Sequence, residues 1–271
     1  MFSGSSRGEK RSKKRGASVE FADFRPYNLG DDIRRIDWNA YGRFEKLFLK
    51  QFLEEEDLDI TLLLDASLSM GFGDPTKLLL AQQIAGALGY IGLKSFDRVS
   101  AASFDTNVRA WFPPSRGRGA PPRLFNFLEN QIASGAGDLS ASAKSVAIQA
   151  RRGGIAVVLS DFLLPEGYET GLKTLTARGF DVTAIQVLDR HELEPVLVGD
   201  LKLVDVENRD FVREVTVSDG LRRTYKRNID AHCDGLRTFC RKLGMNYVQV
   251  SNDVPVEATV LRLLRASGLV R

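Results

Sequence analysis

A short apolar run that ends in a regular polar pattern is the feature that most constrains this chain. Residues 59–70 read Asp-Ile-Thr-Leu-Leu-Leu-Asp-Ala-Ser-Leu-Ser-Met, so a strand-like run stops at Asp65, and Ser67 and Ser69 follow at two-residue steps. At the carboxyl end of a buried strand, this pattern can place one carboxylate and two hydroxyls around a single point. Hard oxygen ligands of this kind suit Mg²⁺ or Mn²⁺ rather than zinc. We therefore predict a divalent-cation site here, whereas simple capping of the next helix by the same side chains is the alternative.

A second apolar run carries the other carboxylate of the predicted site. Residues 155–160 are apolar up to a final serine and are followed by Asp161, as expected for a buried parallel strand. Ligands of open α/β sheets lie beyond the carboxyl ends of the strands, so Asp161 is expected on the same rim as Asp65. The alternation of strands and helices implies an α/β fold, a mostly parallel sheet with helices on both faces.

Length and composition allow one large domain with extensions. The chain has 271 residues, of which 43% are hydrophobic, enough to bury a substantial core. We divide it into a flexible basic arm at 1–18, a segment at 19–56 that packs on the main domain, and an α/β domain at 57–271. A strand pair is predicted as an insertion near 196–217.

The charge of the chain does not indicate a nucleic-acid protein. Its net charge is +3, although basic side chains crowd the arm. Like-charge blocks of this kind are usually solvated, and no recognition motif accompanies the charge, so we expect no specific nucleic-acid partner. Contact of the arm with phosphates or a membrane surface stays open as the alternative.

The cysteines and the hydropathy point to a cytoplasmic protein without a membrane span. Cys233 and Cys240 lie two turns apart on one face of a predicted helix, too far for a disulfide within it. We expect two buried thiols in a reducing compartment. No apolar run reaches about 18 residues, and no signal peptide is visible.

The arrangement of Asp65, Ser67, Ser69 and Asp161 resembles the metal-ion-dependent adhesion site of von Willebrand factor A domains. In that family a Thr from a Gly-rich loop completes the ligands, within a Gly-Gly-Thr-Asp-Leu pattern. This chain has Gly-Ala-Gly-Asp-Leu at 135–139, so Gly137 stands where the Thr belongs. Water or a partner would fill that position, which weakens Mg²⁺ binding without excluding it. Ser134 or Ser140 could substitute for the missing hydroxyl.

The segment before the first apolar strand carries a more specific resemblance. Glu20-Phe21-x-Asp23-Phe24-Arg25-x-Tyr27-x-x-Gly30-Asp31-Asp32-x-Arg34-x-Ile36-Asp37-Trp38 is similar to the bacterial family called domain of unknown function fifty-eight. Members join this segment to a von Willebrand A-like domain and are commonly encoded beside MoxR-type AAA+ ATPases. The resemblance implies an AAA+ ATPase or its client as the partner. Within the segment we expect a structural network or partner-binding surface made by Arg25, Asp31, Asp32, Arg34, Asp37 and Trp38.

The resulting prediction is a non-enzymatic interaction module whose cation accepts a carboxylate from a partner. The alternative is a metal-dependent phosphoester hydrolase that uses Asp65, Asp138 and Asp161. Against the hydrolase, His191 and His232 are the only histidines of the sequence, and neither lies in a recognisable nucleophile–base arrangement.

Overall fold

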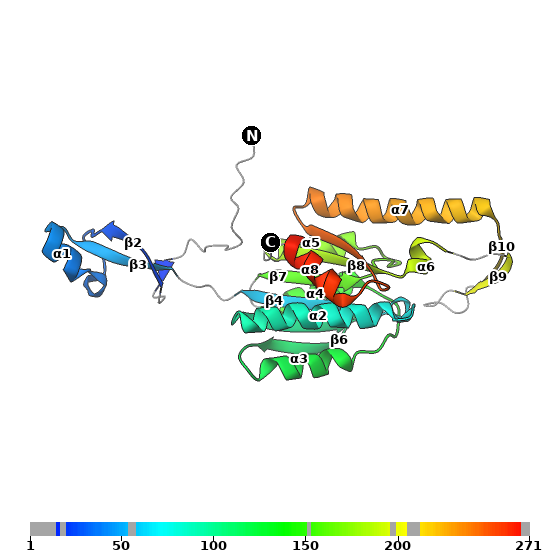
Figure 1. The fold of residues 1–271 in the computed structure, drawn as a ribbon, viewed down its shortest axis with the longest axis horizontal. Helices are drawn as coiled ribbons and strands as arrows, with labels where there is room; N and C mark the ends of the chain where they lie inside the picture. The colour runs from blue at the N-terminus through cyan, green and yellow to red at the C-terminus, as the bar shows by residue number, and fades with distance from the viewer. Residues whose placement is uncertain are drawn as a thin grey trace. The chain divides into compact units, whose positions relative to one another are not determined.

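The computed structural model describes residues 15–16, 20–53, 58–150, 153–195, 199–204 and 212–266. The described residues form an amino-terminal unit that ends before residue 58 and a main unit that begins at Leu58 (Figure 1). The predicted flexible arm lies outside the described residues, apart from residues 15–16, which form a short strand.

The amino-terminal unit is a small antiparallel sheet with one short helix. Its elements are β1 (Arg15–Gly16), β2 (Glu20–Pro26), the 3-10 turn η1 (Ile33–Arg35), α1 (Trp38–Phe44) and β3 (Phe48–Leu53). β3 pairs with both β1 and β2. The connecting segment is tied to β3 because the N–H of Tyr27 donates to Leu47 O and that of Asp37 to Phe48 O, at 2.9 and 2.8 Å.

The main unit alternates strands and helices. Its elements are β4 (Asp59–Asp65), η2 (Leu68–Gly71), α2 (Lys77–Lys94), β5 (Arg98–Phe104), β6 (Val108–Ser115), α3 (Ala120–Glu129), α4 (Leu139–Gln149), β7 (Ile155–Ser160), α5 (Glu169–Ala177), β8 (Asp181–Leu188), α6 (Arg190–Leu193), β9 (Gly199–Val204), β10 (Val212–Val217), α7 (Asp219–Lys242), β11 (Asn246–Ser251) and α8 (Val256–Ala266).

Six of the described strands form the central sheet, in the order β11-β8-β7-β4-β5-β6. All neighbours pair in parallel except β6, which runs antiparallel to β5 at one edge. The chain places β5 on one side of β4 and later returns to place β7 on the other. The topological switch point, where ligands of such sheets bind, therefore lies beyond the carboxyl ends of β4 and β7.

Both faces of the sheet are covered, which explains why its strands are apolar throughout. Leu62 and Leu64 of β4 face a core shared with α2, α3 and the start of α8. Leu63, between them, faces a second core shared with α4, α5 and α7. Alternate side chains of a strand point to opposite faces, so a strand buried on both faces reads as a continuous apolar run. The predicted α/β fold class is confirmed.

Two helix starts have local causes. Thr76 is the N-cap of α2, because its hydroxyl accepts the N–H of Leu79. α3 begins at Ala120, with prolines in its first turn. Proline is tolerated there because the first N–H groups of a helix have no partner within it.

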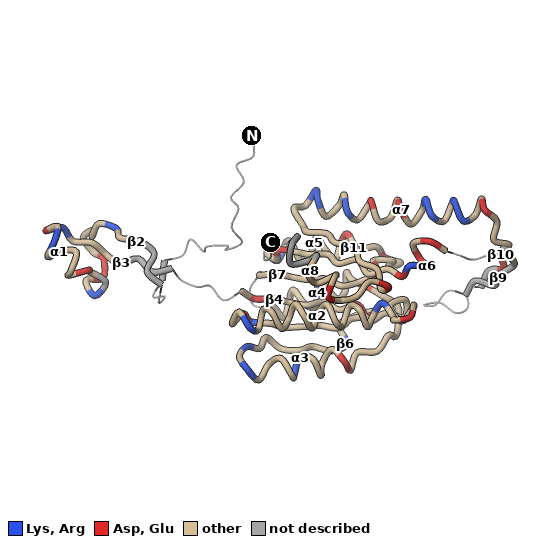
Figure 2. Tube along the Cα trace, viewed as in Figure 1, with Lys and Arg blue, Asp and Glu red and all other residues tan. Residues whose placement is uncertain are grey.

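The inserted strand pair and α7 extend the unit beyond the sheet. β9 and β10 pair antiparallel, while residues 196–198 and 205–211 lie outside the described residues. α7 carries charged side chains along its length (Figure 2). Its buried side chains form one stripe, which is Ile229, Cys233, Leu236 and Cys240.

The two thiols are buried and free, as predicted. Burial raises the pKa of Cys240 to about 11, so this thiol stays protonated and unreactive at neutral pH. Within the described residues, no helix is both long and apolar enough to cross a membrane.

The close approach of α4 and α5 gives a test of the packing. A Cβ added at Gly171 on α5 would lie 2.6 Å from Cγ of Leu139 and 2.9 Å from its carbonyl oxygen. Backbone cannot yield as a flexible side chain does, so Gly171→Ala should destabilise the protein by roughly 1–3 kcal/mol. Urea denaturation measures this, with Gly220→Ala as control, because a Cβ at that position meets only the Ser218 hydroxyl, at 3.7 Å. Equal stability of the two variants would contradict the packing described here.

Candidate functional site

The two predicted carboxylates lie side by side at the topological switch point. Asp65 is the last residue of β4, and Asp161 follows β7, the strand paired with β4 in parallel. Both residues are fully buried. The structure therefore brings together the two aspartates that the sequence places 96 positions apart.

Asp65 is held by hydrogen bonds from its neighbours. The N–H of Ser67 donates to Oδ1 at 2.9 Å, and the hydroxyl of Ser160 donates to Oδ2 at 2.5 Å. Ser67 Oγ lies 3.1 Å from Ser69 Oγ, so the two predicted hydroxyl ligands are adjacent. Burial raises the pKa of Asp65 to about 7, repulsion by Asp161 adds to this rise, and the hydrogen bonds only partly offset it.

Asp161 is paired with a lysine that the sequence analysis did not single out. Lys77 opens α2, its side chain is fully buried, and its ammonium donates to Asp161 Oδ2 at 2.7 Å and Glu192 Oε1 at 2.5 Å. The other oxygen of Asp161 accepts the N–H of Leu163 at 2.9 Å. Burial lowers the pKa of Lys77, but the charges of the two carboxylates outweigh it and raise the pKa above its usual value. Lys77 is therefore charged.

The network continues into α6 and the end of β11. Asp189 caps α6, while Glu192 reaches back to the N–H of Asp189 at 2.8 Å. Asn252 donates to Asp189 Oδ2 at 2.7 Å and to Pro75 O at 2.6 Å, which ties the start of α2 to this corner. The rim thus consists of segments that follow β4, β7, β8 and β11, all joined by polar contacts.

The Gly-rich loop lies on the rim, and the space that a Thr side chain would need at Gly137 is filled. Ser134 N–H donates to Ala66 O, and Gly135 O accepts from Leu68 N–H. A Cβ at Gly137 would lie 3.5 Å from Ser67 Oγ and would clash with Cδ2 of Leu164. Gly137 therefore stands where the Thr ligand would be, and the Leu164 side chain fills the space of the missing hydroxyl. Ser134 does not substitute for it, because its hydroxyl lies near Asp105 and Arg109.

These residues fit a small divalent cation on one side of the rim only. Asp65, Ser67 and Ser69 offer three clustered hard oxygens, as Mg²⁺ and Mn²⁺ require. On the other side, Asp161 is engaged by Lys77 and the loop has no hydroxyl at Gly137. No cluster of three or more His, Cys, Asp or Glu side chains suited to a metal occurs among the described residues. An ion at Asp65 would have to be completed by water or by a partner.

Of the three carboxylates in the hydrolase alternative, Asp65 and Asp161 lie together, whereas Asp138 has a local capping role. Asp138 caps α4, since its carboxylate accepts the N–H of Ala141 at 2.9 Å. His191 Nδ1 lies 2.8 Å from Asp189, the cap of its own helix. His232 packs edge-on against Tyr168, within a hydrophobic part of α7. The structure thus gives Asp138 and both histidines local structural contacts.

The charged residues of the amino-terminal unit mostly fix its local conformation. Arg25 forms a two-pronged ion pair with Asp31, with distances of 2.8 and 2.6 Å. Asp32 caps η1 by accepting Arg34 N–H, and Asp37 caps α1. Trp38 is 64% exposed and packs edge-on against Tyr41.

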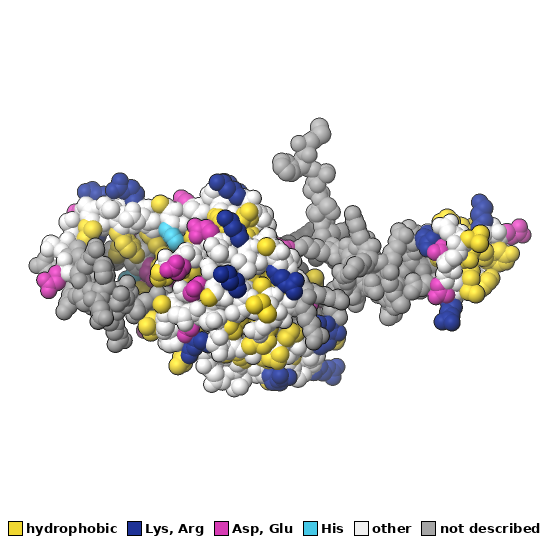
Figure 3. All heavy atoms as spheres, turned by 180° about the vertical axis from the view of Figure 1, so that it is seen from behind, with side chains coloured by type: hydrophobic (Ala, Val, Ile, Leu, Met, Phe, Trp, Pro, Cys, Tyr) yellow, Lys and Arg dark blue, Asp and Glu magenta, His cyan; other side chains and the backbone are white. Residues whose placement is uncertain are grey.

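Hydrophobic side chains gather on the surface of this unit (Figure 3). Those with large exposed fractions are Leu29, Ile33, Trp38, Tyr41 and Phe44. On the face of the main unit seen in Figure 3, basic and acidic side chains are interspersed rather than collected into a basic stripe.

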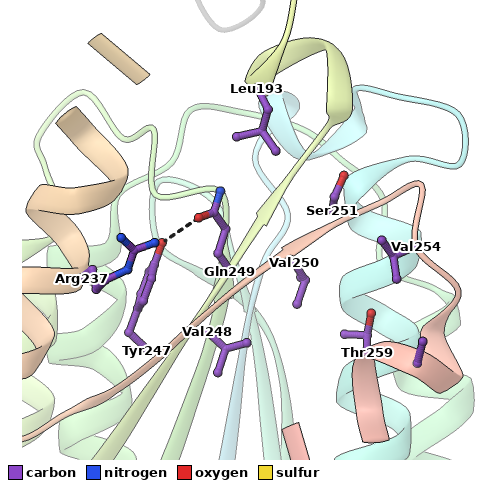
Figure 4. Close-up of a pocket in the computed structure, with 10 residues that line it drawn as sticks. Leu193, Arg237, Tyr247, Val248, Gln249, Val250, Ser251, Val254 and Thr259 are labelled. Carbon is purple, nitrogen blue, oxygen red and sulfur yellow. Dashed lines mark hydrogen bonds between the residues drawn. The ribbon is translucent and has the colours of Figure 1, made fainter. Parts of the chain in front are cut away.

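A separate hollow of about 550 Å³ lies along β11, between α7 and α8 (Figure 4). Val248, Val250 and Val254 line its floor and wall, and Tyr247 and Arg237 stand at one side. Its lining contains neither the predicted ligands nor Lys77, so it is distinct from the rim.

Comparison with known proteins identifies the family. A family model described as "Protein of unknown function DUF58" matches residues 23–234. The chain belongs to this family. It is 29% identical over 254 residues to an uncharacterized protein of Mycobacterium tuberculosis, and the alignment covers 92% of this chain and 80% of that protein.

Solved structures agree with the fold. The pilus adhesin SpaC from Lactobacillus rhamnosus GG matches with a TM-score of 0.51 at 11% identity, over 80% of this chain and 30% of that one. A von Willebrand factor type A protein from Catenulispora acidiphila matches with a TM-score of 0.49 at 10% identity, over 82% and 44%. At such identities the likeness concerns the fold alone. The chain is thus a DUF58 protein whose main unit has a mostly parallel α/β sheet with helices on both faces.

Proposed function

We propose that this DUF58 protein is a protein-interaction module whose binding surface is the rim around Asp65. In this proposal a divalent cation, Mg²⁺ or Mn²⁺, binds Asp65, Ser67 and Ser69, and a partner carboxylate completes its ligands. The observation that carries the proposal is the clustering of these three residues at the switch point of the sheet: Asp65 Oδ1 accepts the backbone N–H of Ser67 at 2.9 Å, and the Ser67 and Ser69 hydroxyl oxygens lie 3.1 Å apart.

The surroundings of the donors favour binding over catalysis. Ser69 is only partly buried, so the site can be reached from solvent. Phe72 and Leu163, from the segments after β4 and β7, are 45% and 36% exposed and supply apolar contact area. Asp138 and His191 are engaged in local hydrogen bonds, which argues against their use as bases that activate water.

The family resemblance supports an AAA+ ATPase of the MoxR type, or its client, as the partner. The two free, buried thiols support a reducing compartment, and we propose the cytoplasm. The exposed aromatic residues of the amino-terminal unit supply a second surface that such a partner can contact.

Loss of Asp65 tests this proposal. We expect Asp65→Ala to abolish Mg²⁺-dependent capture of the AAA+ ATPase, because it removes the one carboxylate of the donor set. Binding is measured with the immobilised chain in Mg²⁺ and in EDTA, and circular dichroism verifies folding.

Asp138→Ala is the matched control, since it removes an aspartate of the same rim that caps a helix and costs about 1 kcal/mol of stability. Capture that survives Asp65→Ala in a folded protein would contradict the proposal. Phosphate release from a generic ester, lost in Asp65→Ala, would favour the hydrolase instead.

A further inference from the structure

Lys77 occupies an unusual position for a lysine. It lies in the first turn of α2, where the helix dipole disfavours a positive charge, and its side chain has no exposed surface. Helix formation therefore does not explain the residue. Its two charged contacts do, because Asp161 and Glu192 approach the ammonium from segments that follow two different strands.

We propose that Lys77 is a built-in cation of the rim, which occupies the Asp161 side and confines any divalent ion to Asp65, Ser67 and Ser69. The inference rests on the proposed function, since it concerns how the same site binds its ion. In this inference Lys77 sets the affinity of the rim for the ion and makes binding of the ion depend on binding of the partner.

The hydrogen bonds of Asp161 show why this side is closed to an ion. One carboxylate oxygen accepts from the ammonium at 2.7 Å and the other from the N–H of Leu163 at 2.9 Å. An ion that took Asp161 as a ligand would have to displace Lys77 from a fully buried position. The ammonium would also repel a divalent ion nearby, and in a buried site such repulsion is weakly screened.

The consequence is weak ion binding by the isolated chain. A single carboxylate, Asp65, remains for the ion, because Asp161 is engaged by Lys77 and by the N–H of Leu163. A carboxylate from a partner would supply the charge that Asp161 does not. Ion and partner therefore bind together, and each strengthens the binding of the other.

The test measures Mn²⁺ binding without any partner, by electron paramagnetic resonance of the free ion. Lys77→Met frees Asp161 and Glu192, so its Mn²⁺ affinity should exceed that of the unmodified chain by at least about tenfold. The double variant Lys77→Met/Glu192→Gln leaves one uncompensated buried charge fewer than Lys77→Met does. If the single variant does not fold, the double variant should likewise bind Mn²⁺ more tightly than the unmodified chain. Adding Asp161→Asn to either variant should remove the gain.

Lys94→Met is the matched control, because Lys94 lies at the opposite end of the same helix and is exposed. Its Mn²⁺ affinity should equal that of the unmodified chain. Unchanged affinity in both Lys77 variants, or a gain that persists with Asp161→Asn, would overturn the inference. The Mn²⁺ measurement contains no partner, so a negative result there would not count against the proposed interaction. Failure of partner capture would instead count against the proposed function.

Discussion

Replacing Lys77 with methionine in ion-free buffer is expected to lower the free energy of unfolding by roughly 3–5 kcal/mol. The substitution leaves Asp161 fully buried and Glu192 largely so, without the ammonium that both contact. Removing one member of a buried ion pair costs more than the pair itself contributes, because an uncompensated charge stays behind. Urea denaturation in EDTA measures the difference.

Two companion variants separate charge from packing. Lys77→Met/Asp161→Asn/Glu192→Gln removes the charges together and should recover most of the lost stability, since a neutral replacement of a buried pair is often tolerated. Lys94→Met should change stability by less than about 0.5 kcal/mol. A triple variant as unstable as Lys77→Met would mean that the lysine stem, rather than its charge, stabilises this corner.

Replacing Asp65 with asparagine is expected to stabilise the ion-free protein at pH 8. Burial raises the pKa of Asp65 from 3.8 to about 7, so the folded state binds a proton more tightly than the unfolded state. The penalty for ionising Asp65 is absent below pH 3.8, grows between 3.8 and about 7, and is complete above 7. Asparagine carries no such penalty. Its amide oxygen can accept the N–H of Ser67, and its amide nitrogen can donate to the hydroxyl of Ser160. The gain should be roughly 2–4 kcal/mol above pH 7 and vanish near pH 4.

Urea denaturation across this pH range in EDTA tests that expectation. The unmodified chain should lose stability relative to Asp65→Asn as the pH rises through the window, and Mg²⁺ should restore part of it by binding the folded state. Asp138→Asn is a suitable control, because it makes the same substitution at an aspartate whose side chain caps α4. A constant difference between Asp65→Asn and the unmodified chain from pH 4 to 8 would contradict the account of Asp65.

The parts of the site that could be predicted from the sequence are the residues at the carboxyl ends of buried strands. A buried strand ends at Asp65 and another before Asp161, and parallel strands bring their carboxyl ends to one edge, so their proximity followed from the pattern alone. The fold class followed for the same reason, because strands apolar at every position require helices on both faces.

Lys77 and Glu192 were missed because their contacts join distant parts of the chain. Lys77 lies 84 positions before Asp161 and 115 before Glu192, and no local pattern records such a contact. A weak signal existed, which is a lysine in the first turn of a helix, where the dipole disfavours it. Asp138 was a candidate catalytic residue by its type and position. In the structure its carboxylate accepts the N–H of Ala141 and caps α4, a role that aspartate commonly has before a helix.

The most direct test of the account uses Asp65→Asn to separate binding from stability. The immobilised chain and this variant are exposed to lysate of the native organism in Mg²⁺ and in EDTA, and captured AAA+ ATPase is quantified by mass spectrometry. We predict capture by the unmodified chain in Mg²⁺ alone and none by Asp65→Asn, although the variant is the more stable protein without ion. Equal capture in EDTA, or by Asp65→Asn, would contradict a cation-dependent rim and move the binding surface to residues 19–53.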